Sequence, residues 1–155
     1  MMSSALLTEY QKNSEQLLEI ARSFSKSDSL ATPMPGEWPA AYVIHHMADA
    51  GLHFATRYLS VIAEDRPAIA AFNEDLYPQR LNYAQRSIAT SAATIAAVHQ
   101  SVFEILSQLS LADWNRVGIH SEKGDVTLTQ IVELAVRHNL GHANQLRELK
   151  AALNK

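Results

Sequence analysis

The chain contains no cysteine, which excludes disulfides, thiolate metal ligands and cysteine nucleophiles. Any thiol chemistry would therefore need the thiol to arrive as a substrate. A cysteine-free chain is compatible with a reducing compartment, and the N-terminal segment lacks the basic start and apolar middle of a signal peptide. We accordingly expect a cytoplasmic protein.

Two further features are lacking: a basic stripe and a long apolar run. The net charge is −3, and the 13 lysines and arginines are scattered, so nucleic-acid binding has no support. No apolar run is long enough to cross a bilayer, so we expect no membrane partner. A chain of 155 residues with 47% hydrophobic and 19% charged residues is typical of one globular domain, here residues 1–155.

What the sequence does contain is helical periodicity. Apolar residues recur at helical spacing in four segments, and we expect helices over about 4–25, 38–64, 83–109 and 127–153. Pro39 fits the first position of the second helix, and Thr127 with Gln130 has the form of a capping box at the start of the fourth. No segment shows the alternation of a strand. These features predict an all-α four-helix bundle.

Long connections follow the second and third predicted helices, over Asp65–Asn82 and Ser110–Val126. The first contains two prolines yet keeps several large apolar side chains. A connection of this length inside a compact domain is usually functional or packed on the body as a lid. We expect Asp65–Asn82 to shape the mouth of a pocket.

Two histidines lie in the apolar stripe of the last segment. His138 and His142 are four residues apart, so they stack on one helix face and can hold a single metal ion. The alternative is a pair of hydrogen-bonded core histidines. A metal centre would need a third ligand from elsewhere in the fold.

The second predicted helix offers that ligand. At about 100° per residue, His46 lies roughly 60° from the centre of its apolar stripe, whereas His45 points about a further 100° away, towards the rim or solvent. His53 lies two turns below His46, as a fourth ligand, a proton carrier or a satisfied histidine. Asp49, one turn from His46, could orient a ligand histidine or pair with an arginine such as Arg57.

A site made of His46, His138 and His142 would have three neutral nitrogen ligands and open positions for water or substrate. That is the pattern of a catalytic metal site, since structural sites are normally closed by four ligands. Without thiolates, the expected ion is Zn²⁺ or another divalent transition metal such as Ni²⁺. His99, in the third predicted helix, either supports a ligand or packs in the core.

Several sequence features together resemble the DinB/YfiT-like superfamily, and are closest to its YfiT-type proteins, provisionally assigned as metal-dependent hydrolases. Trp38 precedes the run His45-His46-Met47-Ala48-Asp49, and His138-x-x-x-His142 lies near the C-terminus. Further matches are Pro67 to Glu74, Val98-His99, and His120 followed by Gly124 and Thr127-Leu128. The resemblance covers about 38–149.

The resemblance implies a bundle with one crossover connection that often forms dimers, and it assigns the metal ligands to His46, His138 and His142. It places the pocket mouth near Phe72, Asn73, Glu74 and Tyr77, which are the candidate substrate contacts. The chain departs from the family pattern in four places. Pro39 replaces Ser or Thr, Phe72-Asn73 replaces Tyr-Asp, and asparagines stand at 139 and 144 where relatives are often richer in histidine.

Three functions are open at this point. A small cellular thiol bound to the metal could attack an electrophilic small molecule, or the metal could activate water for hydrolysis. The third is a non-catalytic metal-binding or stress-associated bundle. No general base is evident beside the metal, and the residues between His138 and His142 lack the glutamate of an HExxH motif. A thiolate needs less help than water, so we favour thiol transfer.

Overall fold

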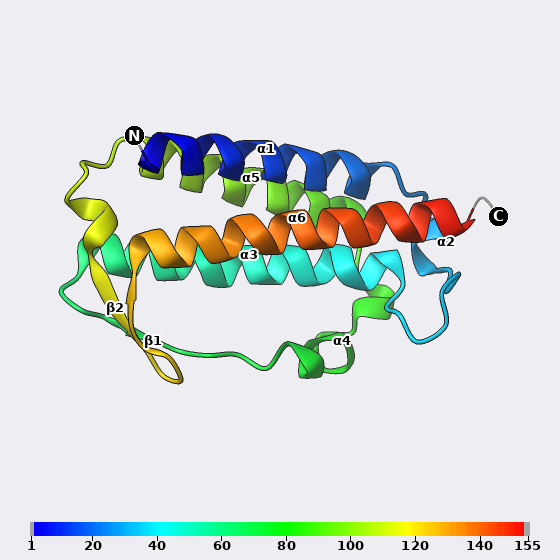
Figure 1. Ribbon diagram of the computed structural model, residues 1–155. Coiled ribbons are helices and arrows are strands. Elements are labelled where there is room, and N and C mark those ends of the chain that lie inside the picture. Colours follow the sequence, from blue (N-terminus) through cyan, green and yellow to red (C-terminus); the bar gives the residue numbers. More distant parts are fainter. Residues whose placement is uncertain (1, 154–155) are drawn as a thin grey trace.

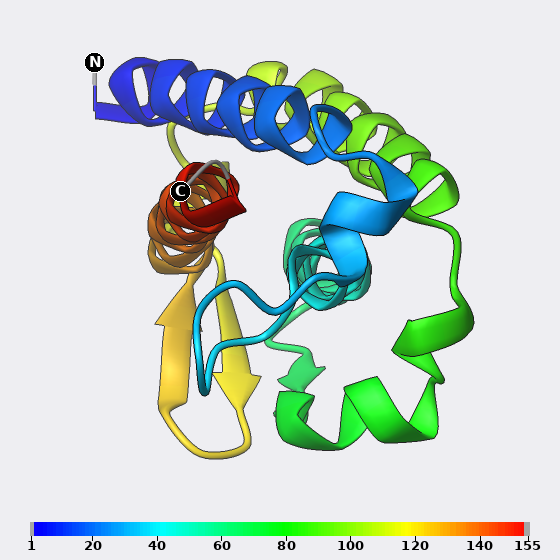
Figure 2. The same cartoon turned by 90° about the vertical axis from the view of Figure 1, so that its right-hand side faces the viewer.

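The computed structural model describes residues 2–153. Four long helices, α1 (Met2–Arg22), α3 (Ala40–Ala63), α5 (Ile88–Ser107) and α6 (Leu128–Leu153), lie side by side in a bundle (Figure 1). Helices α1 and α3 each pack against both α5 and α6. Seen along the bundle, α1 and α5 form one layer and α3 and α6 the other (Figure 2). The predicted helical bundle is confirmed.

The long helices do not simply alternate in direction. Helices α1 and α6 run one way along the bundle, and α3 and α5 run the other way (Figure 1). Because α3 and α5 are parallel neighbours, the chain between them must return along the whole bundle. It does so through β1 (Ala68–Ile69), a 3-10 turn η1 (Glu74–Leu76), α4 (Tyr77–Arg80) and a second turn η2 (Tyr83–Gln85). This crossover connection lies outside the α3/α6 layer (Figure 2).

The helix starts follow local capping chemistry. At α6, the Thr127 hydroxyl accepts from the Gln130 backbone N–H (3.2 Å), and the Gln130 side-chain oxygen accepts from the Thr127 N–H (2.9 Å), which confirms the capping box. Pro39 is the residue before α3 rather than its first residue. Helix α5 begins at Ile88, capped by Ser87, and not at Tyr83 as predicted. Tyr83–Gln85 form the turn η2 instead, and Arg86 after it is extended (φ −74°, ψ 152°), which separates this turn from α5.

A small sheet corrects the all-α prediction. Strand β1 pairs in parallel with β2 (Val117–His120), and β2 pairs antiparallel with β3 (Gly124–Thr127). Each strand has only two to four residues, too few for an alternating pattern to be recognised in the sequence. The sheet ties the crossover connection to the hairpin that leads into α6. Two other short elements are α2 (Lys26–Leu30) and η3 (Asp113–Asn115).

The hairpin is fastened to the C-terminal end of α3. The Arg116 guanidinium donates to the backbone oxygens of Val61 (2.8 Å) and Glu64 (2.7 Å), carbonyls that the helix itself leaves unpaired. Gly118 allows close approach, since a Cβ there would lie 2.5 Å from Ile69 Cδ1 and 2.9 Å from Val61 Cγ2. The connection, the hairpin and α3 therefore form one wall beside α6.

The core fills the space between the four long helices, and it includes polar side chains. Large apolar residues such as Leu17, Ile44 and Leu146 are fully buried. Three histidines, His45, His46 and His99, are buried among them. Within residues 2–153, no helix is both long enough and apolar enough to span a membrane.

Candidate metal centre

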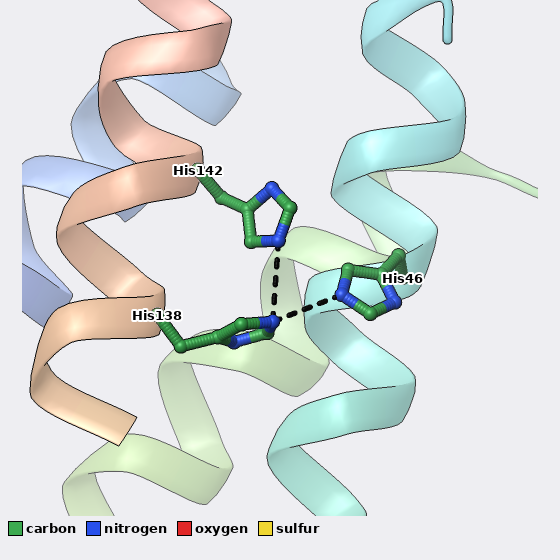
Figure 3. Close-up of side chains that lie close together, drawn as sticks. All are labelled: His46, His138 and His142. Atoms are coloured by element: carbon green, nitrogen blue, oxygen red, sulfur yellow. Dashed lines mark hydrogen bonds between the residues drawn. The ribbon is translucent and has the colours of Figure 1, made fainter. Parts of the chain in front are cut away.

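Three imidazoles converge between α3 and α6. His138 and His142 project from α6 and His46 projects from α3, with their rings facing one another (Figure 3). The Nε2 atoms of His46 and His138 are 3.1 Å apart, and those of His142 and His138 are 3.2 Å apart. One nitrogen from each of the three residues lies within 4.8 Å of the others. The structure thus brings together the three histidines that helical spacing and phase single out.

Aromatic side chains pack against two of these rings, those of His46 and His138. Trp38, just before α3, packs edge-on against His46 with ring centroids 5.8 Å apart. Phe54, two turns after His46, lies 5.9 Å from the ring of His138. These contacts restrict both rings and keep His46 almost fully buried.

The third ring is oriented by hydrogen bonds. His142 Nδ1 lies 2.8 Å from the Gln145 side-chain oxygen, and the Gln145 side-chain nitrogen donates to Glu37 (3.3 Å). Because Glu37 can only accept, the Gln145 amide must turn its oxygen towards His142, so Nδ1 of His142 is the donor. Its Nε2 lone pair then faces His138 and His46. Sequence analysis missed Glu37 and Gln145, although Gln145 lies on the same helix face as His142.

The site favours neutral imidazoles. Burial, reinforced by the neighbouring His142, lowers the pKa of His46 from 6.5 to about 4. Burial, with both neighbouring histidines, lowers the pKa of His138 to about 3. At pH 7 both rings therefore keep a lone pair for a cation.

These features fit a divalent metal. Zinc–nitrogen bonds of about 2.0–2.1 Å in a tetrahedral site place the ligand nitrogens roughly 3.3 Å apart. The distances of 3.1 and 3.2 Å between Nε2 atoms are close to that value. Lone pairs that face one another at this distance need a proton or a cation between them.

A carboxylate of the crossover connection reaches the histidines. Glu74 Oε2 lies 3.7 Å from His46 Nε2, and the Glu74 side chain is 51% exposed. Among the other candidate substrate contacts, the Asn73 side chain accepts from the backbone of Asp75 (3.1 Å) and is turned to its own loop. Glu74 is therefore the candidate substrate contact whose carboxylate pairs with a ligand histidine.

A cleft of about 630 Å³ opens beside the site, a size typical of small-molecule pockets. It lies between the crossover connection, the end of the hairpin, α3 and the first turns of α6. Its walls combine apolar and charged side chains, and the sequence did not predict that these residues come together. They include Phe54, Arg57, Phe72, Glu74, His120, Arg137 and His138. Through His138 and Glu74 the histidine cluster borders this cleft.

His53 and Tyr77 brace the connection rather than extend the cluster. His53 Nε2 lies 2.7 Å from the Tyr77 hydroxyl, and its ring stacks on Phe72 with centroids 4.0 Å apart. Arg57 lies over the same Phe72 ring at 5.5 Å. His53 is thus a satisfied histidine that fixes the position of Phe72 at the cleft.

The prediction that His45 lies towards the rim or solvent is wrong. Its side chain is fully buried, with Nδ1 2.8 Å from the Ser91 hydroxyl and the ring packed against Tyr83. Helical phase identified one inward face of α3, but α5 and η2 cover a second face. A single helix cannot reveal how many neighbours surround it.

Asp49 also differs from the expectation that it orients a ligand histidine. It accepts from the Tyr83 hydroxyl (2.7 Å) and from both guanidinium nitrogens of Arg86 (2.7 and 2.9 Å). The predicted alternative of an arginine partner is right in kind, but the arginine is Arg86 and not Arg57. This network ties the end of the crossover connection to α3 one turn from His46.

We expect Asp49→Ala to lower the free energy of unfolding by about 3 kcal/mol, because it leaves the buried Tyr83 hydroxyl and a half-buried guanidinium unpaired. In thermal denaturation this is a fall of roughly 6–12 °C in melting temperature. The matched control is Asp125→Ala, which removes an equally short but exposed pair with Arg66. An exposed pair contributes little, so equal shifts in the two variants would contradict the assignment.

The fold and the histidine cluster together define a helical bundle with a candidate three-histidine metal centre. Comparison with known families agrees: the model of the DinB superfamily matches residues 9–146. The chain belongs to the DinB superfamily.

Individual relatives carry consistent descriptions. A protein of Oceanobacillus iheyensis, provisionally named a metal-dependent hydrolase, is 28% identical over 118 residues, covering 74% of this chain and 68% of its own. A similarly named protein of Bacillus mycoides is 24% identical over 139 residues, covering 88% and 80%.

Two solved structures share the fold. YfiT from Bacillus subtilis, provisionally described as a metal-dependent hydrolase with an unusual four-helix bundle topology, superposes with a TM-score of 0.87 at 20% identity, over 98% of this chain and 87% of that one. A mycothiol-dependent maleylpyruvate isomerase superposes with a TM-score of 0.75 at 12% identity, over 93% and 60%. At these identities the likeness concerns the fold.

Proposed function

We propose that this protein is a metal-dependent enzyme in which His46, His138 and His142 hold one divalent transition metal, Zn²⁺ or Ni²⁺, beside a small-molecule cleft. The observation that carries the proposal is the convergence of three imidazole nitrogens, with His138 among the residues that line the cleft. A site with three protein ligands keeps positions open for substrate, whereas a structural zinc site is closed by four.

The reaction supported best is hydrolysis of an amide or ester. A bound divalent metal supplies a Lewis acid that polarises a substrate carbonyl and activates water. Glu74 supplies the other requirement, a proton acceptor: its carboxylate lies 3.7 Å from His46 Nε2 and borders the cleft. The sequence favoured thiol transfer because no general base was evident beside the metal. Glu74 is a candidate for that base, so this reason no longer applies. The names of the relatives support the same reaction.

Thiol transfer remains the second candidate, because the cleft combines cationic and aromatic side chains. Arg57, Lys123 and Arg137 line it together with Phe54 and Phe72. The same walls carry the carboxylates of Glu74, Glu122, Asp125 and Glu133, so they suit a zwitterionic cellular thiol and an electrophile bound side by side. The thiol-dependent isomerase of similar fold lends this candidate support at the level of the fold alone.

The test is to assay the metal-loaded protein with two sets of small molecules. One set contains nitrophenyl esters and anilides, and the other pairs small thiols with chlorodinitrobenzene. We expect Glu74→Gln to keep its metal and lose about 10²- to 10⁴-fold in hydrolysis, the usual contribution of a general base. The matched control is Glu122→Gln, an exposed carboxylate in the same cleft. Metal-dependent turnover of thiol and electrophile alone, unaffected by Glu74→Gln, would establish the second candidate instead.

A further inference from the structure

Behind the histidine cluster, the interior of the bundle contains a small cavity. Residues of all four long helices line it, among them Tyr10 of α1, Tyr58 of α3, His99 of α5 and His138 of α6. Its volume is about 10 Å³, close to the space that one water molecule needs. His138 therefore separates two spaces, with the cleft on one side and this cavity on the other.

The cavity gathers buried polar atoms that have no protein partner. Within the described part of the chain, five buried side-chain nitrogen or oxygen atoms lack a hydrogen bond. Three of them belong to residues that line this cavity: the Tyr58 hydroxyl, His99 Nδ1 and His138 Nδ1. A buried polar atom left unpaired costs about 1–3 kcal/mol, and three at one place are satisfied most simply by a shared ligand.

We propose that this cavity binds one structural water molecule, which joins the Tyr58 hydroxyl and His99 Nδ1 to Nδ1 of His138. Tyr58 and His99 are then positioning residues for a ligand histidine that neither of them touches directly. The water site stands on the cavity and its unpaired atoms. The positioning role rests in addition on the proposed metal centre.

Such a water can form a hydrogen bond with each of the three polar atoms. With the Nε2 lone pair of His138 facing the cluster, its Nδ1 carries the proton and donates to the water oxygen. The Tyr58 hydroxyl donates to the second lone pair of the water, and the water donates to Nδ1 of His99. Burial lowers the pKa of His99 to about 4, so its ring is neutral and has a lone pair to accept with. Three bonds are the usual number for a buried water.

This arrangement gives Nδ1 of His138 a fixed hydrogen-bond acceptor, as the Gln145 oxygen does for Nδ1 of His142. Metal-ligating histidines almost always donate their second ring N–H to a fixed acceptor, which sets the tautomer and the ring orientation. Gln145 meets that need for His142, whereas no described side chain does so for His138. Since Nε2 of His138 lies about midway in the cluster, 3.1 and 3.2 Å from the other two, its orientation controls the geometry of the whole site.

The first experiment concerns the water alone. A high-resolution crystal structure of the protein prepared with a chelator, or water–protein nuclear Overhauser effects in the same sample, shows whether the cavity is hydrated. We expect one ordered water within hydrogen-bond distance of the three atoms. A dry cavity would overturn the proposal whatever the metal content.

The second experiment measures the positioning role as affinity for Co²⁺, titrated by its visible absorption. We expect Tyr58→Phe to weaken Co²⁺ binding about 10-fold or more and to alter the absorption bands, because loss of a group that orients a ligand typically costs 10- to 100-fold. The matched control, Tyr83→Phe, removes another buried tyrosine hydroxyl that lies outside the cavity. We expect its affinity to stay within about threefold of the native value.

Substitutions at His99 separate hydrogen bonding from packing. His99→Gln keeps a polar group and should retain most of the affinity, whereas His99→Leu fills the space without one and should weaken binding about 10-fold or more. Equal losses in the two variants, with both folded by circular dichroism, would assign His99 to packing and refute the positioning role. A native protein that binds no Co²⁺ would refute the proposed function and with it the positioning role, while the water site would still be decided by the first experiment.

Discussion

Replacing His46 with alanine should abolish stoichiometric binding of Zn²⁺ or Ni²⁺ while leaving the helical bundle folded. His46 is the ligand that α3 contributes, and only His138 and His142 of the same helix remain without it. Two ligands make a far weaker site than three, so we expect a loss greater than the roughly 100-fold that follows from disturbing a ligand's supporting hydrogen bond. Elemental analysis after gel filtration and competition with a chelating dye measure the loss.

The neighbouring histidine is a closely matched control. His45 is as deeply buried as His46 and lies on the same helix, but it is bonded to Ser91 and not to α6. We expect His45→Ala to keep one equivalent of metal and to lower the melting temperature, because it removes a buried hydrogen bond and leaves a cavity. Metal retained by His46→Ala, or lost from a folded His45→Ala, would refute the assignment of the ligands.

The fold and the histidine cluster could be predicted from the sequence because both depend on one periodicity. The 3.6-residue repeat that buries the apolar stripes also places His46, His138 and His142 on inward faces. The capping box at Thr127 is likewise a local pattern, and it was correctly located. Such features need no knowledge of which helices become neighbours.

The features that the sequence did not predict depend on contacts between elements that lie far apart in the chain. The burial of His45 follows from α5 and Tyr83 covering a second face of α3, and the pairing of Asp49 with Arg86 joins residues 37 positions apart. The strands are too short for a recognisable alternation, and β1 exists only because the hairpin lies beside it. The water site beside His138 is formed by all four helices, so no single segment of sequence could indicate it.

The second large effect that we expect is steep acid unfolding of the metal-free protein. Burial lowers the pKa of His45, His46 and His99 to about 4 and that of His138 to about 3, against 6.5 for an ordinary histidine. Above about pH 6.5 these residues are neutral in both the folded and the unfolded chain, so they add no pH dependence. Between about pH 6.5 and 4 the unfolded chain binds protons that the folded protein excludes.

The sign and size of the effect follow from that difference in bound protons. Each such histidine makes the free energy of unfolding fall by about 1.4 kcal/mol per pH unit as the pH decreases. Four together give about 5.5 kcal/mol per unit, comparable to the whole stability of many domains. We therefore expect the chelator-treated protein to unfold well above pH 4. Below about pH 4 the folded protein takes up protons too, and the dependence fades.

Urea denaturation followed by circular dichroism at several pH values between about 7 and 5 measures this slope. The His45→Gln variant should reduce the slope by about one proton, whatever its own stability, because Gln does not titrate. A native slope of one proton or less would mean that the buried histidines are charged in the folded protein. That result would refute the acid sensitivity. It would not bear on the metal centre, because a metal ion displaces protons from the rings that bind it.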